Sequence, residues 1–465
     1  METAGHNLEE YQSVHLIGIG GIGMSGIAEY LVGKGVTVSG SDIRESLTTR
    51  RLERIGVKVI LGHAGENIPE DCELVIYTSA LDEENAELKR ARAIGTKLIK
   101  RAEALGNIVN KQFLIAVSGT HGKTTTTAMI AKVLIDADVD PTVFVGGALD
   151  FFEGGSSKIG NGDVAVVEAD EYDRSFLRLS PDILIITNID SDHLDIYRDM
   201  NDIIDNFKMF IAKRKKSAKV IACGDDKDVL TAIKDIKDKV TYGFDKGNNF
   251  VISDMSFDGS KSDYTIDGNM VSLKVPGAHN VLNSAACYLT ARELKLSVNT
   301  INESLRDFRG VHRRLELKYE NGLLIYDDYA HHPAEVKASL DAMKRLRHDG
   351  RIITVFQPHL FTRTRDFYKE FAEAFKETDI LFLAKIYPAR EKEIEGVSSR
   401  LILNEYFKMG KNGIYIEKNE ELLDTLEDMT REGDIVVFQG AGDITGVCEK
   451  FVARLNNKRA ASVPL

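Results

Sequence analysis

A glycine-rich segment between an apolar run and a helix-forming run constrains the fold of this chain most. Residues 119–127 read GTHGKTTTT, and they follow the apolar residues 113–117 and precede the helix-forming residues 128–134. A strand, a glycine loop and a helix in this order turn backbone N–H groups and a helix N-terminus toward phosphate. The segment therefore predicts a loop that binds the phosphates of a nucleotide. Its binding residues are expected to be Gly119, Thr120, His121, Gly122, Lys123, Thr124 and Thr125.

The side chains of this loop fit a nucleotide-consuming enzyme. Lys123 is expected to reach the terminal phosphates, and the hydroxyl of Thr124 is expected to bind Mg²⁺. The general pattern GxxxxGK[ST] places a glycine where this chain has Val117, and the first glycine comes two residues later, at Gly119. The alternative is a turn with a solvated lysine, but the strand and helix around the loop favour phosphate binding.

Length and charge limit the class of protein. The 465 residues suit about three domains of ordinary size. The formal net charge of −12 argues against a general nucleic-acid binder, whose phosphate contacts need a basic surface. Phosphate sites are therefore expected to be local pockets of N–H groups, lysine and arginine.

The cysteines and the hydropathy pattern bear on the compartment. Cys72, Cys223, Cys287 and Cys448 are scattered without the spacing of a metal site, which predicts free thiols in a reducing compartment. The sequence shows neither a charged-then-apolar leader nor an uninterrupted apolar run near 18 residues. We therefore expect a cytoplasmic protein without membrane insertion; the sequence specifies no oligomeric state.

A second glycine turn lies near the N-terminus. The apolar residues 14–18 run into GIGGIGMSG, a helix is expected through 27–31, and a strand at 36–38 leads to Asp42. A G-x-G-x-x-G turn with an acid about twenty residues further on is typical of dinucleotide or nucleotide-sugar binding. NAD, FAD and another nucleotide diphosphate all remain open at this point. The expected ligand-binding residues are Gly18, Gly20, Gly21, Gly23, Met24, Ser25 and Asp42.

The remaining pattern predicts an α/β protein of three domains. Apolar strands at 164–167 and 183–187 follow the phosphate loop, and residues 240–275 resemble a short β excursion. After residue 314, apolar runs at 323–326, 352–356, 380–384 and 435–438 alternate with helix-length stretches at 333–347 and 366–375. This alternation predicts parallel sheets with ligands at the carboxyl ends of the strands. The expected domains are 1–108, which is Rossmann-like; 109–311, which carries the phosphate loop and the β excursion; and 312–465, which is again Rossmann-like.

Polar residues gather where these strands end. Glu168 follows a strand next to the phosphate loop, and it can complete a Mg²⁺ shell begun by Thr124, because Mg²⁺ prefers oxygen ligands. The alternative is a solvated carboxylate. His193 is a softer ligand than Mg²⁺ favours, so a helix-start or core histidine is an equal alternative.

Three further pairs are candidates for substrate contacts. Asn280 and Asn283 share a helix face and can read a base edge, or cap the helix. Arg313 or Arg314 can neutralise a transferring phosphate, or form an interface salt bridge. His359 and Arg363 suit a substrate carboxylate, with a surface helix start as the alternative.

Nine motifs in order give the chain a close resemblance to the Mur ligases, the ATP-dependent amino-acid-adding enzymes of peptidoglycan synthesis. The resemblance covers all but the extreme termini. The motifs are GIGGIGMSGIA at 18–28, SGTHGKTTTT at 118–127, EADEYDRSF at 168–176, NIDSDHLDIY at 188–197, HNVLN at 279–283, GVHRR at 310–314, DDYAHHP at 327–333, FQPHLFTRTR at 356–365 and GAGDI at 440–444.

The resemblance implies substrates and roles for these residues. It implies ATP with two Mg²⁺ ions, UDP-N-acetylmuramate at the first glycine turn and L-alanine as the incoming amino acid; a member that adds a tripeptide or another amino acid is the alternative. Lys123, Glu168, His193, Asp328 and one of Arg313 and Arg314 match catalytic positions, with Thr124, Glu168 and His193 near the metal. Asn280 and Asn283 match an ATP-contacting pair. His332, His359 and Arg363 fall where the amino acid is held.

The resemblance leaves three points open. Lys208 lies 15 residues past His193, the spacing of a carbamoylated lysine in several Mur ligases, although Phe207 is one residue away. The base that accepts the amine proton is His193, His332 or His359. Leu360 and Phe361 stand where close relatives have Arg-Tyr, so part of the amino-acid pocket is expected to differ.

Overall fold

The computed structural model describes residues 7–79, 81–191, 196–347, 349–389 and 391–462, with side chains through residue 459. The chain forms two compact units. One comprises residues 1–254, 265–271 and 282–308, and the other comprises 255–264, 272–281 and 309–465.

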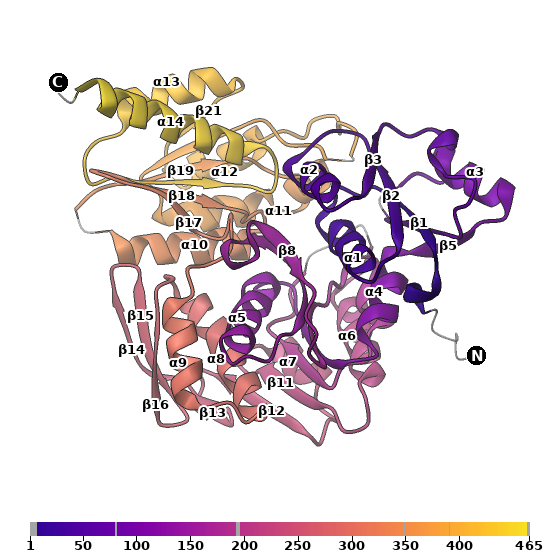
Figure 1. The fold of residues 1–465 in the computed structure, drawn as a ribbon. Coiled ribbons are helices and arrows are strands. Elements are labelled where there is room, and N and C mark those ends of the chain that lie inside the picture. The colour runs from indigo at the N-terminus through magenta and orange to yellow at the C-terminus, as the bar shows by residue number, and fades with distance from the viewer. Residues whose placement is uncertain (1–6, 80, 192–195, 348, 390, 463–465) are drawn as a thin grey trace. The chain divides into compact units, whose positions relative to one another are not determined.

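The first unit begins with a five-stranded parallel sheet in the order β3-β2-β1-β4-β5 (Figure 1). Strand β1 is buried throughout, as expected for a central parallel strand covered on both faces. The elements of this part are β1 (Ser13–Ile17), α1 (Ile22–Gly33), β2 (Thr37–Asp42), α2 (Leu47–Arg54), β3 (Lys58–Leu61), β4 (Leu74–Tyr77), α3 (Ala86–Ile94), β5 (Lys97–Lys100) and α4 (Arg101–Val109).

An eight-stranded sheet carries the phosphate loop. Its order is β13-β12-β11-β10-β6-β9-β7-β8, and it is parallel except for β8, which runs antiparallel to β7. The loop thus follows the strand between β10 and β9, and polar residues after all three strands meet at one edge. The elements are β6 (Phe113–Ser118), α5 (Lys123–Asp136), β7 (Thr142–Leu149), β8 (Gly155–Lys158), β9 (Val164–Glu168), β10 (Ile183–Ile186), α6 (Met200–Lys213), β11 (Lys219–Cys223), α7 (Lys227–Ala232), β12 (Lys239–Gly243) and β13 (Phe250–Val251).

The predicted β excursion is a three-stranded sheet in the order β14-β15-β16. It lies between the phosphate-loop sheet and two helices in the sequence. The elements are β14 (Ser253–Asp258), β15 (Lys261–Ile266), β16 (Asn269–Leu273), α8 (Ala278–Glu293) and α9 (Val298–Asp307).

The second unit contains a six-stranded sheet in the order β17-β18-β22-β19-β20-β21, in which only the β17–β18 pair is antiparallel. The elements are β17 (Glu316–Glu320), β18 (Leu324–Asp328), α10 (Pro333–Leu346), β19 (Ile352–Phe356), α11 (Phe361–Ala374), β20 (Ile380–Leu383), α12 (Arg400–Lys408), β21 (Gly413–Tyr415), α13 (Asn419–Met429), β22 (Ile435–Gln439) and α14 (Ile444–Ser462).

Burial follows from this layering. Both faces of the C-terminal sheet are covered, and one apolar cluster lies on each side of it. Alternate residues of β19 point to opposite faces, so Ile352 and Phe356 join one cluster while Ile353 and Val355 join the other. All four cysteines are buried and free, in agreement with the prediction of free thiols.

The predicted fold class is confirmed, including the three α/β sheets and the small β excursion. Two boundaries differ from the sequence prediction. Helix α11 begins at Phe361 and not near 366, and the β excursion begins at Ser253 and not near 240, because β12 and β13 belong to the phosphate-loop sheet. The structure also adds strands that were not predicted, among them the edge strands β3, β5, β8, β17 and β21.

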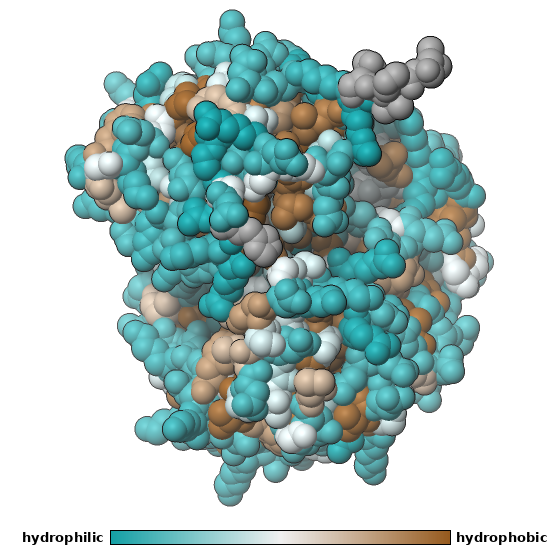
Figure 2. Space-filling model, turned by 90° about the vertical axis from the view of Figure 1, so that its left-hand side faces the viewer, coloured by the Kyte–Doolittle hydropathy of each residue, from teal (hydrophilic) through white to brown (hydrophobic). Residues whose placement is uncertain are grey.

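On the face shown in Figure 2, hydrophilic residues predominate, and hydrophobic residues occur in small groups between them. In the described part of the chain, no helix combines the length and the apolar composition needed to cross a bilayer.

Candidate active site

The phosphate loop joins β6 to α5 and depends on two glycines with positive φ. Gly119 has φ of 132°, and a Cβ added to it would lie 2.1 Å from Oγ1 of Thr187. Gly122 is the N-cap residue of α5 with φ of 83°. Both conformations favour glycine, so the two glycines of the motif are required by the backbone.

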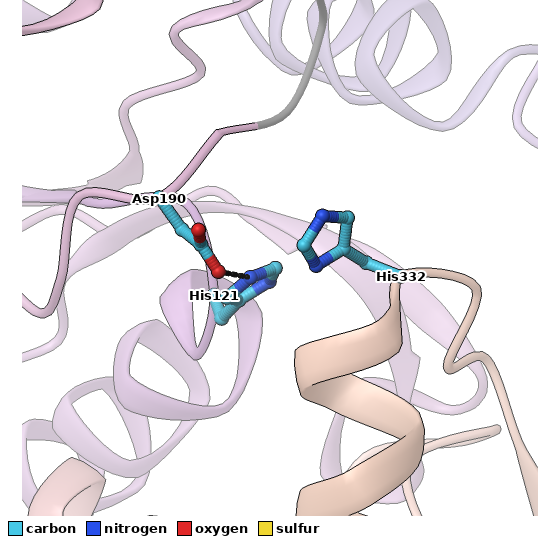
Figure 3. A group of neighbouring side chains, drawn as sticks. All are labelled: His121, Asp190 and His332. Atoms are coloured by element: carbon cyan, nitrogen blue, oxygen red, sulfur yellow. Dashed lines mark hydrogen bonds and ion pairs between the residues drawn. The ribbon is translucent and has the colours of Figure 1, made fainter. Parts of the chain in front are cut away.

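The ends of neighbouring strands brace this loop. The His121 N–H donates to Oδ1 of Asn188 at 2.8 Å, and the Asn188 amide and the Thr187 hydroxyl donate back to the His121 carbonyl at 2.9 and 2.6 Å. The His121 ring lies 3.3 Å from the Asp190 carboxylate, measured from Nε2 to Oδ2 (Figure 3). The loop is therefore held in shape by the chain itself before any nucleotide binds.

Lys123 points back along the loop. Its Nζ donates to the carbonyls of Gly119 and Thr120 at 2.7 and 3.0 Å, and it pairs with the buried carboxylate of Glu171 at 2.8 Å. Burial alone lowers the pKa of Lys123, but Glu171 and two further acids nearby raise it, and the net pKa lies above the usual value. The ammonium group therefore stays charged, as a phosphate-binding lysine requires.

Two oxygen ligands suitable for a divalent cation meet beside Lys123. Oγ1 of Thr124 donates to Oε1 of Glu168 at 3.1 Å, and the Gly146 N–H donates to Oε2 of the same carboxylate at 2.8 Å. A hydroxyl and a carboxylate are the hard oxygen donors that Mg²⁺ prefers, so this pair fits that ion. His193, the third predicted ligand, lies outside the described residues.

Lys208 lies on the exposed side of α6. Its side chain is 49% exposed, and its Nζ pairs with Asp205 at 3.1 Å. The preceding Phe207 is buried, with its ring edge against Phe176. Lys208 is therefore a solvated surface lysine in this structure.

Asn280 and Asn283 are both buried on α8. A Cβ added to Gly122 would lie 2.4 Å from Oδ1 of Asn283, so Asn283 packs directly against the phosphate loop. The Asn280 amide donates to the Pro276 carbonyl at 2.8 Å, which ties this residue to the segment just before α8.

The first glycine turn joins β1 to α1. Gly18 has φ of 80°, and its N–H donates to the Ser41 carbonyl at 2.8 Å. The Gly20 N–H donates to Oδ2 of Asp42 at 2.9 Å, so the acid of the motif stabilises the turn itself. The N-cap residue Gly21 offers no side chain to the helix end, whose first N–H groups lack intrahelical partners.

Three other predicted residues of this turn differ in exposure. Met24 and Ser25 are buried, and the Ser25 hydroxyl donates to the Ile22 carbonyl at 3.0 Å. Gly23 lies beside the side chain of Arg101. Of the three, Gly23 alone is partly exposed.

The two arginines before β17 have different environments. The Arg313 guanidinium donates to the carbonyls of Gly440 and Gly442 at 2.8 and 3.2 Å. The Arg314 guanidinium makes no hydrogen bond to another described residue; it lies 3.7 Å from Glu335 and 5.0 Å from the Tyr329 ring centre. Arg313 is anchored within its own domain by these two hydrogen bonds, whereas the N–H donors of Arg314 make no hydrogen bond to another described residue.

Asp328 is buried at the end of β18. It accepts hydrogen bonds from the Ser339 hydroxyl, the Leu315 N–H and the Gln439 amide. Burial raises the pKa of this carboxyl, and its hydrogen bonds act in the opposite direction. These contacts tie Asp328 to the helix and strand around it.

The predicted amino-acid residues lie at the carboxyl ends of β18 and β19. Nη1 of the buried Arg363 lies 3.5 Å from Nδ1 of His359, whose ring stacks on Tyr387 at 5.7 Å between centres. His332 is buried at the N-cap of α10, and its ring accepts from the Ala334 N–H at 3.4 Å. His359 and Arg363 form a pair, and the His332 ring contributes to the cap of α10.

Two residues of this region were absent from the predicted site. Glu171 holds Lys123, and Asn188 holds the loop backbone at His121. Both lie within strand-end motifs that the sequence pointed out, at 168–176 and 188–197. Their roles depend on side-chain direction, which the motifs do not reveal.

The phosphate loop, the adjacent oxygen ligands and the three α/β sheets define a nucleotide-dependent enzyme built of Rossmann-like parts. Three family models match the chain: "Mur ligase family, catalytic domain" at residues 13–113, "Mur ligase middle domain" at 117–291 and "Mur ligase, glutamate ligase domain" at 313–442. The chain belongs to the Mur ligase family.

Individual relatives cover nearly the whole chain. The UDP-N-acetylmuramate–L-alanine ligase of Acetivibrio thermocellus is 42% identical over 453 residues, which are 95% of this chain and 96% of the relative. The solved UDP-N-acetylmuramate–alanine ligase of Thermotoga maritima is 31% identical with a TM-score of 0.83, covering 96% and 99% of the two chains. A MurF ligase of T. maritima, solved in complex with ADP, shares the fold at 17% identity and a TM-score of 0.64, covering 91% and 96%.

Proposed function

We propose that this Mur ligase joins L-alanine to the lactyl carboxylate of UDP-N-acetylmuramate, with ATP converted to ADP and phosphate. The observation that carries the proposal is the 42% identity to a ligase of that name over nearly all of both chains. The product, UDP-N-acetylmuramoyl-L-alanine, is a precursor of peptidoglycan.

The chemistry follows from the groups at the phosphate loop. The lactyl carboxylate attacks the γ-phosphate of ATP, which gives an acyl phosphate and ADP. The amine of L-alanine then attacks the acyl carbon, and phosphate leaves through a tetrahedral intermediate. Lys123 leaves its loop carbonyls to bind the phosphoryl oxygens, and Glu171 keeps the ammonium charged before that step.

Thr124 and Glu168 would hold Mg²⁺. When bound, the ion would neutralise charge on the phosphate oxygens. His193 remains a proposed ligand, and a second ion is part of the same proposal.

Arg314 is proposed as the arginine that faces the transferring phosphate. Its guanidinium donors are uncommitted among the described residues, whereas those of Arg313 bind two carbonyls. Replacing Arg314 with glutamine should lower kcat by about 10²- to 10³-fold without changing the unfolding temperature. Arg313→Gln should lower the unfolding temperature, since it removes hydrogen bonds inside the domain.

His359 and Arg363 are proposed to hold the L-alanine carboxylate. Arginine binds a carboxylate through two parallel N–H donors, and the contact with His359 fixes the direction of that fork. Domain boundaries near 108/109 and 311/312, and action in the cytoplasm, are further proposals; four buried free thiols support the second of them.

The decisive experiment measures phosphate release from ATP with and without each co-substrate. The proposal requires release to depend on both UDP-N-acetylmuramate and L-alanine. Release that ignores either co-substrate would refute the ligase function. Glycine, L-serine and a tripeptide in place of L-alanine test the amino-acid assignment, and a preference for the tripeptide would favour a peptide-adding Mur ligase.

A further inference from the structure

Arg101 lies beside the first glycine turn but belongs to none of the motifs discussed above. It is the first residue of α4 and follows β5 directly, so it projects from the carboxyl edge of the sheet. A Cβ added to Gly23 would lie 2.7 Å from Nη1 and 3.1 Å from Cδ of Arg101. The missing side chain of Gly23 therefore makes room for this guanidinium at the first turn of α1.

The position is electrostatically unfavourable for a cation. The N-terminal end of a helix carries a partial positive charge, which favours acidic residues and disfavours basic ones. Arg101 occupies the first turn of its own helix and lies next to the first turn of α1 as well. Two positive helix ends and a guanidinium together form a site that an oxyanion would stabilise.

The described residues do not supply that oxyanion at close range. Among the described residues, Arg101 makes no hydrogen bond, and its one acidic neighbour is Asp170, with Oδ2 3.9 Å from Nη2. The side chain is 26% exposed. Arg51 in the same domain has the same exposure, but it pairs with Glu29 at 2.6 Å. Arg101 thus has five N–H donors and no firm partner.

The side chain of Arg101 extends from the first glycine turn toward Asp170, which lies near the second. Asp170 follows β9 and directly precedes Glu171, the residue that pairs with Lys123 of the phosphate loop. A group bound by Arg101 would therefore lie between the first turn and the acids next to the phosphate loop.

We propose that Arg101 is an acceptor-binding residue that pairs with an oxyanion of the sugar nucleotide at the first glycine turn. The inference rests on the proposed function, because it takes UDP-N-acetylmuramate as the ligand of that turn. The oxyanion is either the diphosphate or the lactyl carboxylate. The two are distinguished by which sugar nucleotides bind more weakly when Arg101 is replaced.

The experiment measures binding to the full-length wild-type protein and to Arg101→Gln by calorimetry. The ligands are UDP-N-acetylmuramate, UDP-N-acetylglucosamine, which lacks the lactyl carboxylate, and a non-hydrolysable ATP analogue. Loss of a charge-assisted bidentate contact should weaken acceptor binding by about 10- to 100-fold. The affinity for the ATP analogue should stay within about twofold. In turnover, the KM for UDP-N-acetylmuramate should rise by a larger factor than kcat falls.

Three further variants separate an effect on binding from an effect on the fold. Arg51→Gln removes an equally exposed arginine that has its own partner, and it should leave acceptor affinity within about twofold. Asp170→Asn breaks the one ion pair of Arg101, and acceptor binding without ATP should not weaken. Arg101→Lys keeps the positive charge but lacks the planar guanidinium, so it should recover part of the acceptor affinity. This variant also tests the proposal if Arg101→Gln does not fold.

The outcomes are distinct. Equal weakening of both sugar nucleotides supports a contact to the diphosphate, and weakening confined to UDP-N-acetylmuramate supports a contact to the carboxylate. Unchanged acceptor affinity in folded Arg101→Gln, or an equal loss for acceptor and ATP analogue, would overturn the inference. Failure of the wild type to bind UDP-N-acetylmuramate would instead refute the proposed function.

Discussion

The two glycine turns of this chain share a plan and differ in how their cations are held. Each follows a parallel strand and begins a helix, at 18–23 and at 119–122. In the second turn, Lys123 binds the loop carbonyls and Glu171. In the first turn, the described residues offer Arg101 one acid, Asp170, at 3.9 Å.

The difference suggests separate tasks for the two turns. A loop that must be ready for a highly charged triphosphate keeps its lysine charged and in place by means of its own acid. Under the proposal above, the first turn receives the acceptor, and the N–H donors of Arg101 bind an oxyanion of that ligand. The glycine pattern alone cannot distinguish these tasks, which is why NAD, FAD and a sugar nucleotide all fitted the first turn.

The largest expected effect tests the second turn. Lys123→Ala should lower kcat for ligation by about 10²- to 10³-fold, because it removes a preorganised charge from the transferring phosphate. Lys132→Ala is the matched control, since Lys132 lies on the same helix α5 and pairs only with Asp136 among described residues. Ligation near the wild-type rate in Lys123→Ala would contradict the phosphate-loop role.

Gly122→Ala should be the next most severe. The alanine would have to adopt φ of 83°, and its Cβ would lie 2.4 Å from Oδ1 of Asn283. A left-handed conformation alone costs about 1–2 kcal/mol for a residue with a Cβ. The affinity for an ATP analogue should fall by about tenfold or more, and acceptor binding should change little. Equal loss of both would remove the functional distinction between the turns.

Glu171→Gln addresses the lysine–acid pair. The free energy of unfolding at pH 7 should fall by about 1–3 kcal/mol, because a buried ammonium loses its charged partner. The folded-state pKa of Lys123 is raised above 10.5, so the stabilisation that depends on the charged lysine is present at pH 7 and is lost as the pH rises through the folded-state value.

The measurement is chemical denaturation at several pH values. The difference between wild type and Glu171→Gln should shrink above pH 10.5. Asp136→Asn, which breaks the more exposed pair with Lys132, should cost less than about 0.5 kcal/mol. A pH-independent difference between Glu171→Gln and the wild type would rule out the charged pair as its cause.

The smallest effect is expected at the first turn. Gly23→Ala places a Cβ against the tip of Arg101, a flexible side chain that can move at a cost below about 1.4 kcal/mol. The KM for UDP-N-acetylmuramate should therefore rise by less than about tenfold, without a change in the KM for ATP. Gly33→Ala at the other end of α1 is the control, because its Cβ meets no atom within 4 Å. Identical KM values for UDP-N-acetylmuramate in Gly23→Ala and Gly33→Ala would contradict a contact between Arg101 and the acceptor.

Much of the fold was predictable because its signals are local and repeated. Apolar runs such as 183–187 and 352–356 mark buried parallel strands, and glycine placement marks both turns. The edge strand β17 was missed because its residues, ELKYE, alternate only weakly and none of them is fully buried. Edge strands bury too little apolar surface to leave a clear pattern.

The candidate site was less predictable because it depends on contacts between distant residues. Lys123 and Thr124 follow from the loop motif, but Glu171 acquires its role only when β9 packs beside β6. Arg101 reads as an ordinary first residue of a helix until Gly23 is placed beside it, 78 positions earlier in the chain. Pairing of this kind is a property of the folded chain and leaves no spacing signal.

The four buried cysteines make the protein a convenient subject for site-directed labelling. Burial raises the pKa of each thiol, to about 12 in Cys223, so little thiolate is available to a maleimide at neutral pH. A single cysteine introduced at an exposed position, such as Lys408 on α12, would react while the four buried thiols would not. Pairs of such labels, one on each compact unit, would report by fluorescence how far the units move when substrates bind.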